Sequence, residues 1–209
     1  GAKRHRFETL QRLLPERGRY AECHLIRHRR QHVRGLLQQF IEGATENNNT
    51  MHGYQVNIAP RGAERTGEVL VKHGEPPISE PREGSDRYLN TTKWNTLRIR
   101  VTGSKMSIGI NGVDFGSVED ESFLGGNICL QVEGGQTGSA EIRYRNPRVD
   151  DLRRMGYWRP LFDGKSLEGW KIYGTEDFHV KDGVIECRRG PKESEGYLAT
   201  LELFTDFRV

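Results

Sequence analysis

The chain has 209 residues, of which 34% are hydrophobic, 29% are charged and 25 are glycine. This length allows one or two domains with a sizeable core. The many glycines among scattered aromatic residues favour a turn-rich β protein over a helical bundle. Three widely spaced cysteines exclude a disulfide framework and a zinc-binding pattern, and Cys129 and Cys187, in apolar runs, are expected to be buried thiols. No run approaches the roughly 18 apolar residues of a membrane span, so no membrane partner is expected.

The net charge of +3 is unevenly distributed. Residues 1–34 hold ten Lys and Arg against three Glu, a net charge of +7, and the other 175 residues have a net charge of −4. His24, His28 and His32 would share one face of a helix, but no carboxylate or Cys completes a known metal-binding pattern. We interpret 1–34 as a basic extension, helical or disordered, rather than as a metal site or a nucleic-acid interface.

A short segment alternates strictly between apolar and polar residues. Tyr54, Val56 and Ile58 fall on one side of an extended chain. Gln55 and Asn57 fall on the other. This pattern predicts a half-buried strand with a polar face.

The strongest strand signal runs from Trp94 to Val118. Alternating segments there are separated by short turns, and Asn111-Gly112 is the dipeptide most typical of a two-residue hairpin. The segment is predicted to be a three-stranded antiparallel meander. Shorter strands are expected at 35–41, 66–71, 126–132 and 140–145.

A linker at 151–160 separates these strands from a second block, 161–209. This block opens with an Asp163-Gly164 turn and continues with strands that include Phe178-His179-Val180. No helix is predicted after residue 45. The chain is therefore expected to be all-β, with turns at the spacing of a sandwich.

Two blocks of motifs resemble the 3-keto-disaccharide hydrolase domain family. The opening motifs of that family match Leu161-Phe162-Asp163-Gly164-Lys165, Gly169-Trp170 and Phe178-His179-Val180-Lys181-Asp182-Gly183-Val184-Ile185. The closing motifs match Gly53-Tyr54-Gln55-Val56-Asn57-Ile58, Trp94-Asn95, Asn111-Gly112-Val113, Gly126-Asn127-Ile128-Cys129-Leu130-Gln131 and Ile142-Arg143-Tyr144-Arg145-Asn146. The resemblance implies a concanavalin A-like, two-sheet antiparallel jelly-roll sandwich.

The two blocks stand in reverse order along this chain. The closing half of a sandwich, 35–150, precedes an opening half, 161–209, as in a tandem pair of domains cut at both ends. We expect the two halves to complete one sandwich, because each alone would leave open sheet edges. The parent chain would then carry further domains.

The resemblance also implies a sugar site on a polar sheet face. Gln55 and Asn57 are the predicted substrate-binding residues of that face, because their amides can donate to and accept from sugar hydroxyls. Trp94 and Arg98 are further substrate-binding candidates, Trp94 by stacking on a sugar ring. Gln55 stands where the family often has Glu, and Gln39 where it has Arg, which favours binding over hydrolysis.

Chemistry on a 3-keto sugar needs no carboxylate pair, because the keto group acidifies the neighbouring C–H and allows elimination. One base and a carbonyl-polarising group or a divalent metal would suffice. His179, with Gln55, is the catalytic candidate; no cofactor is expected, and no metal-ligand set is identified.

Three readings of function remain open from the sequence. The first is a periplasmic or extracellular hydrolase of 3-keto-disaccharides. The second is a non-catalytic, laminin-G-like carbohydrate-binding module, and the third is an inactive fragment of a tandem-domain protein.

Overall fold

The computed structural model describes residues 21–26, 37–38, 53–58, 65–71, 77–90, 93–132, 141–154, 157–174, 177–188 and 196–209. In these ranges the chain forms two antiparallel β-sheets and one short 3-10 turn, η1 (Ser85–Tyr88). None of the helical residues described belongs to a segment long and apolar enough to span a membrane.

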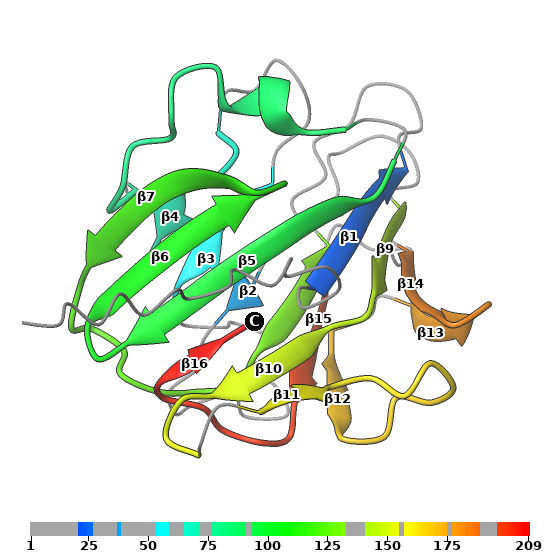
Figure 1. The fold of residues 1–209 in the computed structure, drawn as a ribbon. Helices are drawn as coiled ribbons and strands as arrows, with labels where there is room; N and C mark the ends of the chain where they lie inside the picture. The colour runs from blue at the N-terminus through cyan, green and yellow to red at the C-terminus, as the bar shows by residue number, and fades with distance from the viewer. Residues whose placement is uncertain are drawn as a thin grey trace, which may run out of the picture.

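The larger sheet has ten strands, in the order β11-β10-β16-β5-β1-β9-β14-β13, with β6 on the other edge of β5 and β7 beyond β6 (Figure 1). Their bounds are β1 Ala21–Ile26, β5 Asn95–Thr102, β6 Lys105–Ile110, β7 Val113–Glu119, β9 Glu141–Arg145, β10 Arg148–Asp151, β11 Trp158–Pro160, β13 Asp177–Lys181, β14 Val184–Arg188 and β16 Phe207–Arg208.

The smaller sheet has six strands, in the order β12-β15-β8-β2-β3-β4. Their bounds are β2 Leu37–Gln38, β3 Gln55–Val56, β4 Val69–Leu70, β8 Cys129–Val132, β12 Trp170–Tyr173 and β15 Gly196–Thr200. In Figure 1, β2, β3 and β4 lie behind β5, β6 and β7.

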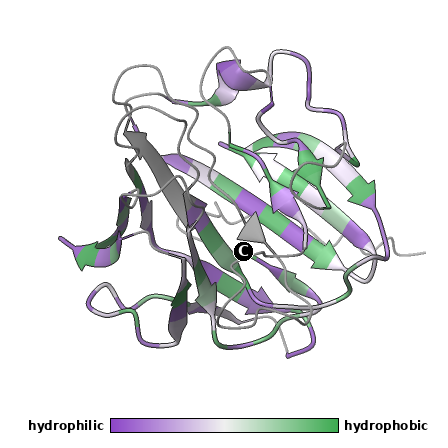
Figure 2. Cartoon of the chain, turned by 180° about the vertical axis from the view of Figure 1, so that it is seen from behind, coloured by the Kyte–Doolittle hydropathy of each residue, from purple (hydrophilic) through white to green (hydrophobic). Residues whose placement is uncertain are grey.

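One hydrophobic core lies between the two sheets. Hydrophilic and hydrophobic residues alternate along the strands, so each sheet has one apolar face (Figure 2). Val56 and Leu130 of the smaller sheet share a buried cluster with Ile99, Ile142 and Ile185 of the larger one. The expected all-β, two-sheet antiparallel sandwich is therefore confirmed.

Strands from the end of the chain lie inside both sheets. β14 pairs with β9, and β15 pairs with β8. β16 pairs with β5 and β10, and the backbones of Val209 and Ile99 exchange two hydrogen bonds of 2.8 Å. The segment expected to be a linker contributes β11, because Trp158, Arg159 and Pro160 pair with β10.

Residues 21–26 correct one expectation about the basic extension. They form β1, which pairs with β5 on one side and β9 on the other, whereas a helical or disordered segment was expected. Residues 21–26 contain no Lys or Arg, and two neighbouring strand edges satisfy their backbone groups. The remainder of 1–34 lies outside the described residues.

The predicted meander is confirmed as β5, β6 and β7. Its hairpin turn has φ of 51° at Asn111 and 79° at Gly112, the positive values that a two-residue turn needs. Asn111 also accepts a 2.8 Å hydrogen bond from the Thr96 backbone N–H and donates to the Tyr88 carbonyl at 2.6 Å. Cys129 on β8 and Cys187 on β14 are buried free thiols, as expected.

Candidate functional site

The outward face of the smaller sheet carries buried polar side chains. Tyr54, Val56 and Ile58 join the core, so the alternating Gln55 and Asn57 point to the opposite face. Gln55 is 2% exposed and Asn57 is 1% exposed, although they do not face the core. We call Gln55, Asn57, Glu68, Gln131 and Tyr197 the polar face.

Three side chains of the polar face form a hydrogen-bonded chain. Gln55 Nε2 donates to Asn57 Oδ1 at 2.9 Å, and Asn57 Nδ2 donates to Glu68 Oε2 at 2.5 Å. Arg65 Nε, at the rim, donates to the same oxygen at 2.8 Å. Both of these hydrogen bonds from described residues to the carboxylate end on Oε2.

The backbone holds Glu68 opposite Asn57. Asn57 N donates to Glu68 O at 2.9 Å, and Gly67 N donates to Asn57 O at 2.8 Å, which extends the β3–β4 ladder. Gly67 has a φ of 85°, and a Cβ there would lie 2.4 Å from Phe115. Only glycine therefore fits the turn that brings Glu68 onto the polar face.

A second polar pair lies on β8 and β15. Gln131 and Tyr197 are partners in register, and Gln131 Nε2 lies 3.4 Å from the Tyr197 hydroxyl. No group among the described residues hydrogen-bonds to the buried Oε1 of Gln131. Such an orphaned acceptor costs about 1–3 kcal/mol, a cost that a donor on a bound ligand would remove.

Strand β2 connects the two polar groups. The backbone of Gln38 is in register with both Gln55 and Cys129, which places the side chains of Gln55 and Cys129 on one sheet face. Cys129 and Gln131 are two residues apart and share that face as well. Burial raises the pKa of the Cys129 thiol well above its usual value. The thiol therefore stays protonated and contributes a neutral group to the polar face, not a nucleophile.

Arg98 and Trp94, both predicted to bind substrate, lie away from the polar face. Arg98 is exposed on β5 of the larger sheet and lines a groove on its outer surface. Trp94 is half-buried immediately before β5, and the Arg145 guanidinium lies 4.2 Å from the centre of its ring. That guanidinium covers one face of the ring, so a sugar could stack on that face only by displacing it.

His179 lies on the outer surface of the larger sheet, because its neighbour Phe178 joins the core. Its Nδ1 is 3.2 Å from Asp177 Oδ2 and its Nε2 is 3.3 Å from Glu186 Oε2. Glu186 is buried and lies 2.9 Å from Arg143. Since Gln55 faces outward from the other sheet, the structure does not bring these two catalytic candidates together.

The sequence reasoning did not single out Glu68 or Gln131. Glu68 falls in the expected strand 66–71, where the apolar Val69 beside it is too weak a signal to assign Glu68 to the face of Asn57. Gln39 lies outside the described residues. Among the residues described, no three His, Cys, Asp or Glu side chains gather into a metal-ligand set.

Comparison with protein families agrees with the resemblance seen in the motifs. A family model described as a 3-keto-alpha-glucoside-1,2-lyase-like domain matches residues 29–150 and 157–209. The curated proteins and the solved structures yield no significant match.

Proposed function

Because the chain belongs to the 3-keto-α-glucoside-1,2-lyase-like domain family, we propose that its polar face binds a 3-keto-glycoside and cleaves it by elimination. The observation that supports this proposal is the buried network of Gln55, Asn57 and Glu68, which ends in a carboxylate. On the same face, Gln131 adds a buried amide oxygen that accepts no hydrogen bond from the residues the structure describes.

Elimination needs a base but no water. The ketone at C3 acidifies the hydrogen on C2, and the base removes that proton. The electron pair of the C2–H bond forms the C1–C2 double bond while the C1–O bond breaks. The departing oxygen keeps the electrons of the C1–O bond and takes up a proton, which gives a free alcohol and an unsaturated 3-keto sugar. The step therefore needs a proton acceptor near C2 and hydrogen-bond donors near the keto oxygen.

Glu68 is the proton acceptor in this proposal. Gln55 cannot accept the proton, because an amide is not a base of useful strength. Glu68 lies two hydrogen bonds away through Asn57, and its Oε1 is the carboxylate oxygen not engaged by Asn57 or Arg65. The second N–H of the Gln55 amide is a donor for the keto oxygen or a sugar hydroxyl.

One observation favours the alternative, a non-catalytic carbohydrate-binding module. Glu68 Oε2 accepts from both Asn57 and Arg65, which is how a structural carboxylate is fixed. In that case Gln55 and Gln131 would bind sugar hydroxyls through their amides, and no bond would be cleaved.

The two functions differ in products and in binding. The purified chain is incubated with a 3-keto-glucose disaccharide, with and without chelator, and the free glucose and the unsaturated ketone are followed by chromatography and ultraviolet absorbance. Glu68→Gln should lower the rate by about 100-fold or more, the usual contribution of a general base. Glu119→Gln, at an exposed glutamate of β7, is the matched control and should keep the rate.

Thermal unfolding with the same sugar completes the test. No cleavage, with a rise in melting temperature that Gln131→Ala abolishes, would establish the binding module instead. If the sugar is not cleaved and the melting temperature does not rise, a sugar site on the polar face is refuted.

A further inference from the structure

The side chain of Arg65 lies beside the proton acceptor proposed for the polar face. Arg65 Nε donates to Glu68 Oε2 at 2.8 Å. The Arg65 side chain is 41% exposed and that of Glu68 is 5% exposed, so the guanidinium is the part of this pair that reaches the surface. The hydrogen bond uses Nε, and neither Nη group of Arg65 bonds to another described residue. Both Nη groups therefore have N–H donors for a bound ligand.

A β-turn keeps the two charges together. Glu68 N donates to Arg65 O at 3.2 Å, and Gly67, the third residue of the turn, has a φ of 85°. These features are typical of a type II turn, in which the first and last Cα atoms lie less than about 7 Å apart. Thr66, the second residue, is fully buried. The guanidinium and the carboxylate are thus in place before a ligand arrives, and binding requires little reorganisation.

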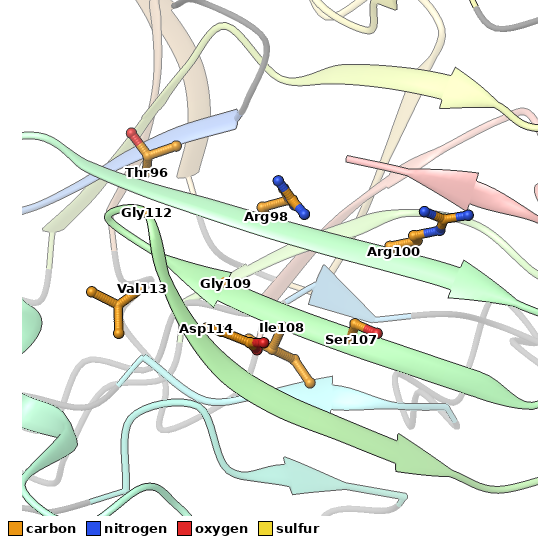
Figure 3. A pocket seen from close by; sticks show the side chains of 9 residues that line it. All are labelled: Thr96, Arg98, Arg100, Ser107, Ile108, Gly109, Gly112, Val113 and Asp114. Carbon is orange, nitrogen blue, oxygen red and sulfur yellow. The ribbon is translucent and has the colours of Figure 1, made fainter. Parts of the chain in front are cut away.

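Other cations lie too far from Glu68 to act with it. Lys171 is on the outward face of the same sheet, but β12 and β4 are the opposite edges of that sheet, five strand spacings or about 24 Å apart. Arg98 and Arg100 line a groove on the outer surface of the larger sheet (Figure 3). The hydrophobic core separates that groove from the polar face. Arg65 is the cation that lies next to Glu68.

The keto oxygen of a 3-keto-glycoside needs a donor close to the base. Removal of the C2 proton places negative charge on the oxygen at C3, and a preorganised donor at that oxygen speeds the step. A charged donor forms a hydrogen bond roughly twice as strong as a neutral one. Because C2 and C3 are bonded to each other, the donor and the base must lie side by side. The planar guanidinium meets this requirement, since the bond to Nε holds both Nη groups beside Glu68.

We propose that Arg65 is a catalytic residue that stabilises the negative charge on the keto oxygen, an inference that rests on the lyase function proposed above. Glu68 takes the C2 proton, and the electron pair of the C2–H bond moves into the C3 carbonyl, which becomes an enolate. An Nη group of Arg65 donates to the enolate oxygen. The carbonyl then forms again as the C1–C2 double bond forms and the C1–O bond breaks, and the departing oxygen takes up a proton. The Gln55 amide donates to a sugar hydroxyl.

Hydrogen exchange separates this role from cleavage. The C3 ketone of 1,5-anhydroglucitol has a hydrogen on C2 but no glycosidic oxygen at C1, so it can form the enolate without releasing an alcohol. In D₂O the wild type should replace the C2 hydrogen by deuterium, which NMR follows. Arg65→Ala should lower kcat for this exchange by about 100-fold, the usual cost of removing an oxyanion donor. Arg154→Ala, at an exposed arginine paired with Asp151, is the matched control and should keep the rate.

The carbonyl stretch distinguishes a contact with the substrate from an effect through Glu68. The same ketone, labelled with carbon-13 at C3, is bound to Glu68→Gln, which lacks the base and does not turn it over. Its infrared C=O stretch should shift to lower frequency than in solution, because the guanidinium polarises the bond. The double variant Glu68→Gln/Arg65→Ala should lose the shift. A residue that only positions Glu68 would not move this frequency.

Three outcomes would overturn the proposal. Exchange that survives Arg65→Ala but is lost in Glu68→Gln would leave Glu68 as the base and remove Arg65 from the reaction. Slow exchange in Arg65→Ala with an unchanged carbonyl frequency in the double variant would make Arg65 a positioning residue. A wild type that neither exchanges the ketone nor cleaves a 3-keto-glycoside would refute the lyase function, and the role of Arg65 with it.

Discussion

The Asn57 side-chain amide donates to Glu68 Oε2 at 2.5 Å across the β3–β4 pair. Both side chains are almost fully buried, so this bond fixes the orientation of a carboxylate that has little contact with solvent. Gln55, in turn, donates to Asn57 and fixes the orientation of its amide. The position of Glu68 thus depends on a residue that itself performs no chemistry.

Asn57→Ala should therefore affect both stability and cleavage. Removing the amide takes one donor from a buried carboxylate, and we expect the free energy of unfolding to fall by about 1–3 kcal/mol. Cleavage should fall as well, because Glu68 loses its fixed orientation. Urea unfolding and the release assay measure the two effects. Ser117→Ala, at an exposed serine of β7, is the control, and an Asn57→Ala variant with unchanged stability would contradict the buried network.

His179→Ala should separate stability from function. His179 lies on the outer surface of the larger sheet, with both ring nitrogens near carboxylates, so cleavage of a 3-keto-glycoside should keep its rate. The free energy of unfolding should fall by about 1 kcal/mol, because Glu186 keeps Arg143 as a partner. Arg143→Ala should cost about 3 kcal/mol, since it weakens the pairing of the buried Glu186. A cleavage rate that drops only in His179→Ala would restore His179 as the base.

The sequence predicts local features well. Strict alternation at 54–58 and at 94–101 places Gln55, Asn57 and Arg98 on the faces opposite the core, and the structure agrees. The Asn111-Gly112 turn forms as expected, because its dihedral angles are set by two adjacent residues. These features depend on neighbours in the chain, which is why a single sequence suffices.

Features that depend on distant strands were not predictable from alternation. Alternation gives the face on which a side chain lies but not the sheet, so Gln55 and His179 were grouped although they belong to different sheets. β4 has only two residues, Val69 and Leu70, too few for a pattern to mark Glu68 beside it. β1 forms because β5 and β9 leave room for a strand between them, which the basic residues that flank it in 1–34 do not indicate.

Asn111→Gly should test how much the side-chain hydrogen bonds of Asn111, one of which joins the β6–β7 turn to η1, contribute to stability. Glycine accepts the positive φ of this position, so the turn itself should persist. The variant loses the Asn111 hydrogen bonds to the Thr96 N–H and the Tyr88 carbonyl. We expect a loss of about 1–3 kcal/mol in the free energy of unfolding, measured by urea unfolding. Gly112→Ala is the control, because it strains the turn but keeps those hydrogen bonds and so shows the cost of strain alone. An Asn111→Gly variant as stable as the wild type would show that the hydrogen bonds contribute nothing to stability.

Tyr54 should make stability fall at alkaline pH. Burial, and then its hydrogen bond of 2.6 Å to Asp120 Oδ1, raise the pKa of Tyr54 from 10.0 to about 12. The unfolded chain releases the phenol proton near pH 10 and the folded chain only near pH 12, so the stabilisation is complete below pH 10 and is lost as the pH rises to about 12. The free energy of unfolding should fall by at most about 3 kcal/mol over this range.

Urea unfolding between about pH 9 and pH 12 should show a shallower decline of that free energy for Tyr54→Phe than for the wild type. Tyr157→Phe, at a tyrosine that is 81% exposed, should decline like the wild type, and equal slopes for all three proteins would refute the assignment to Tyr54.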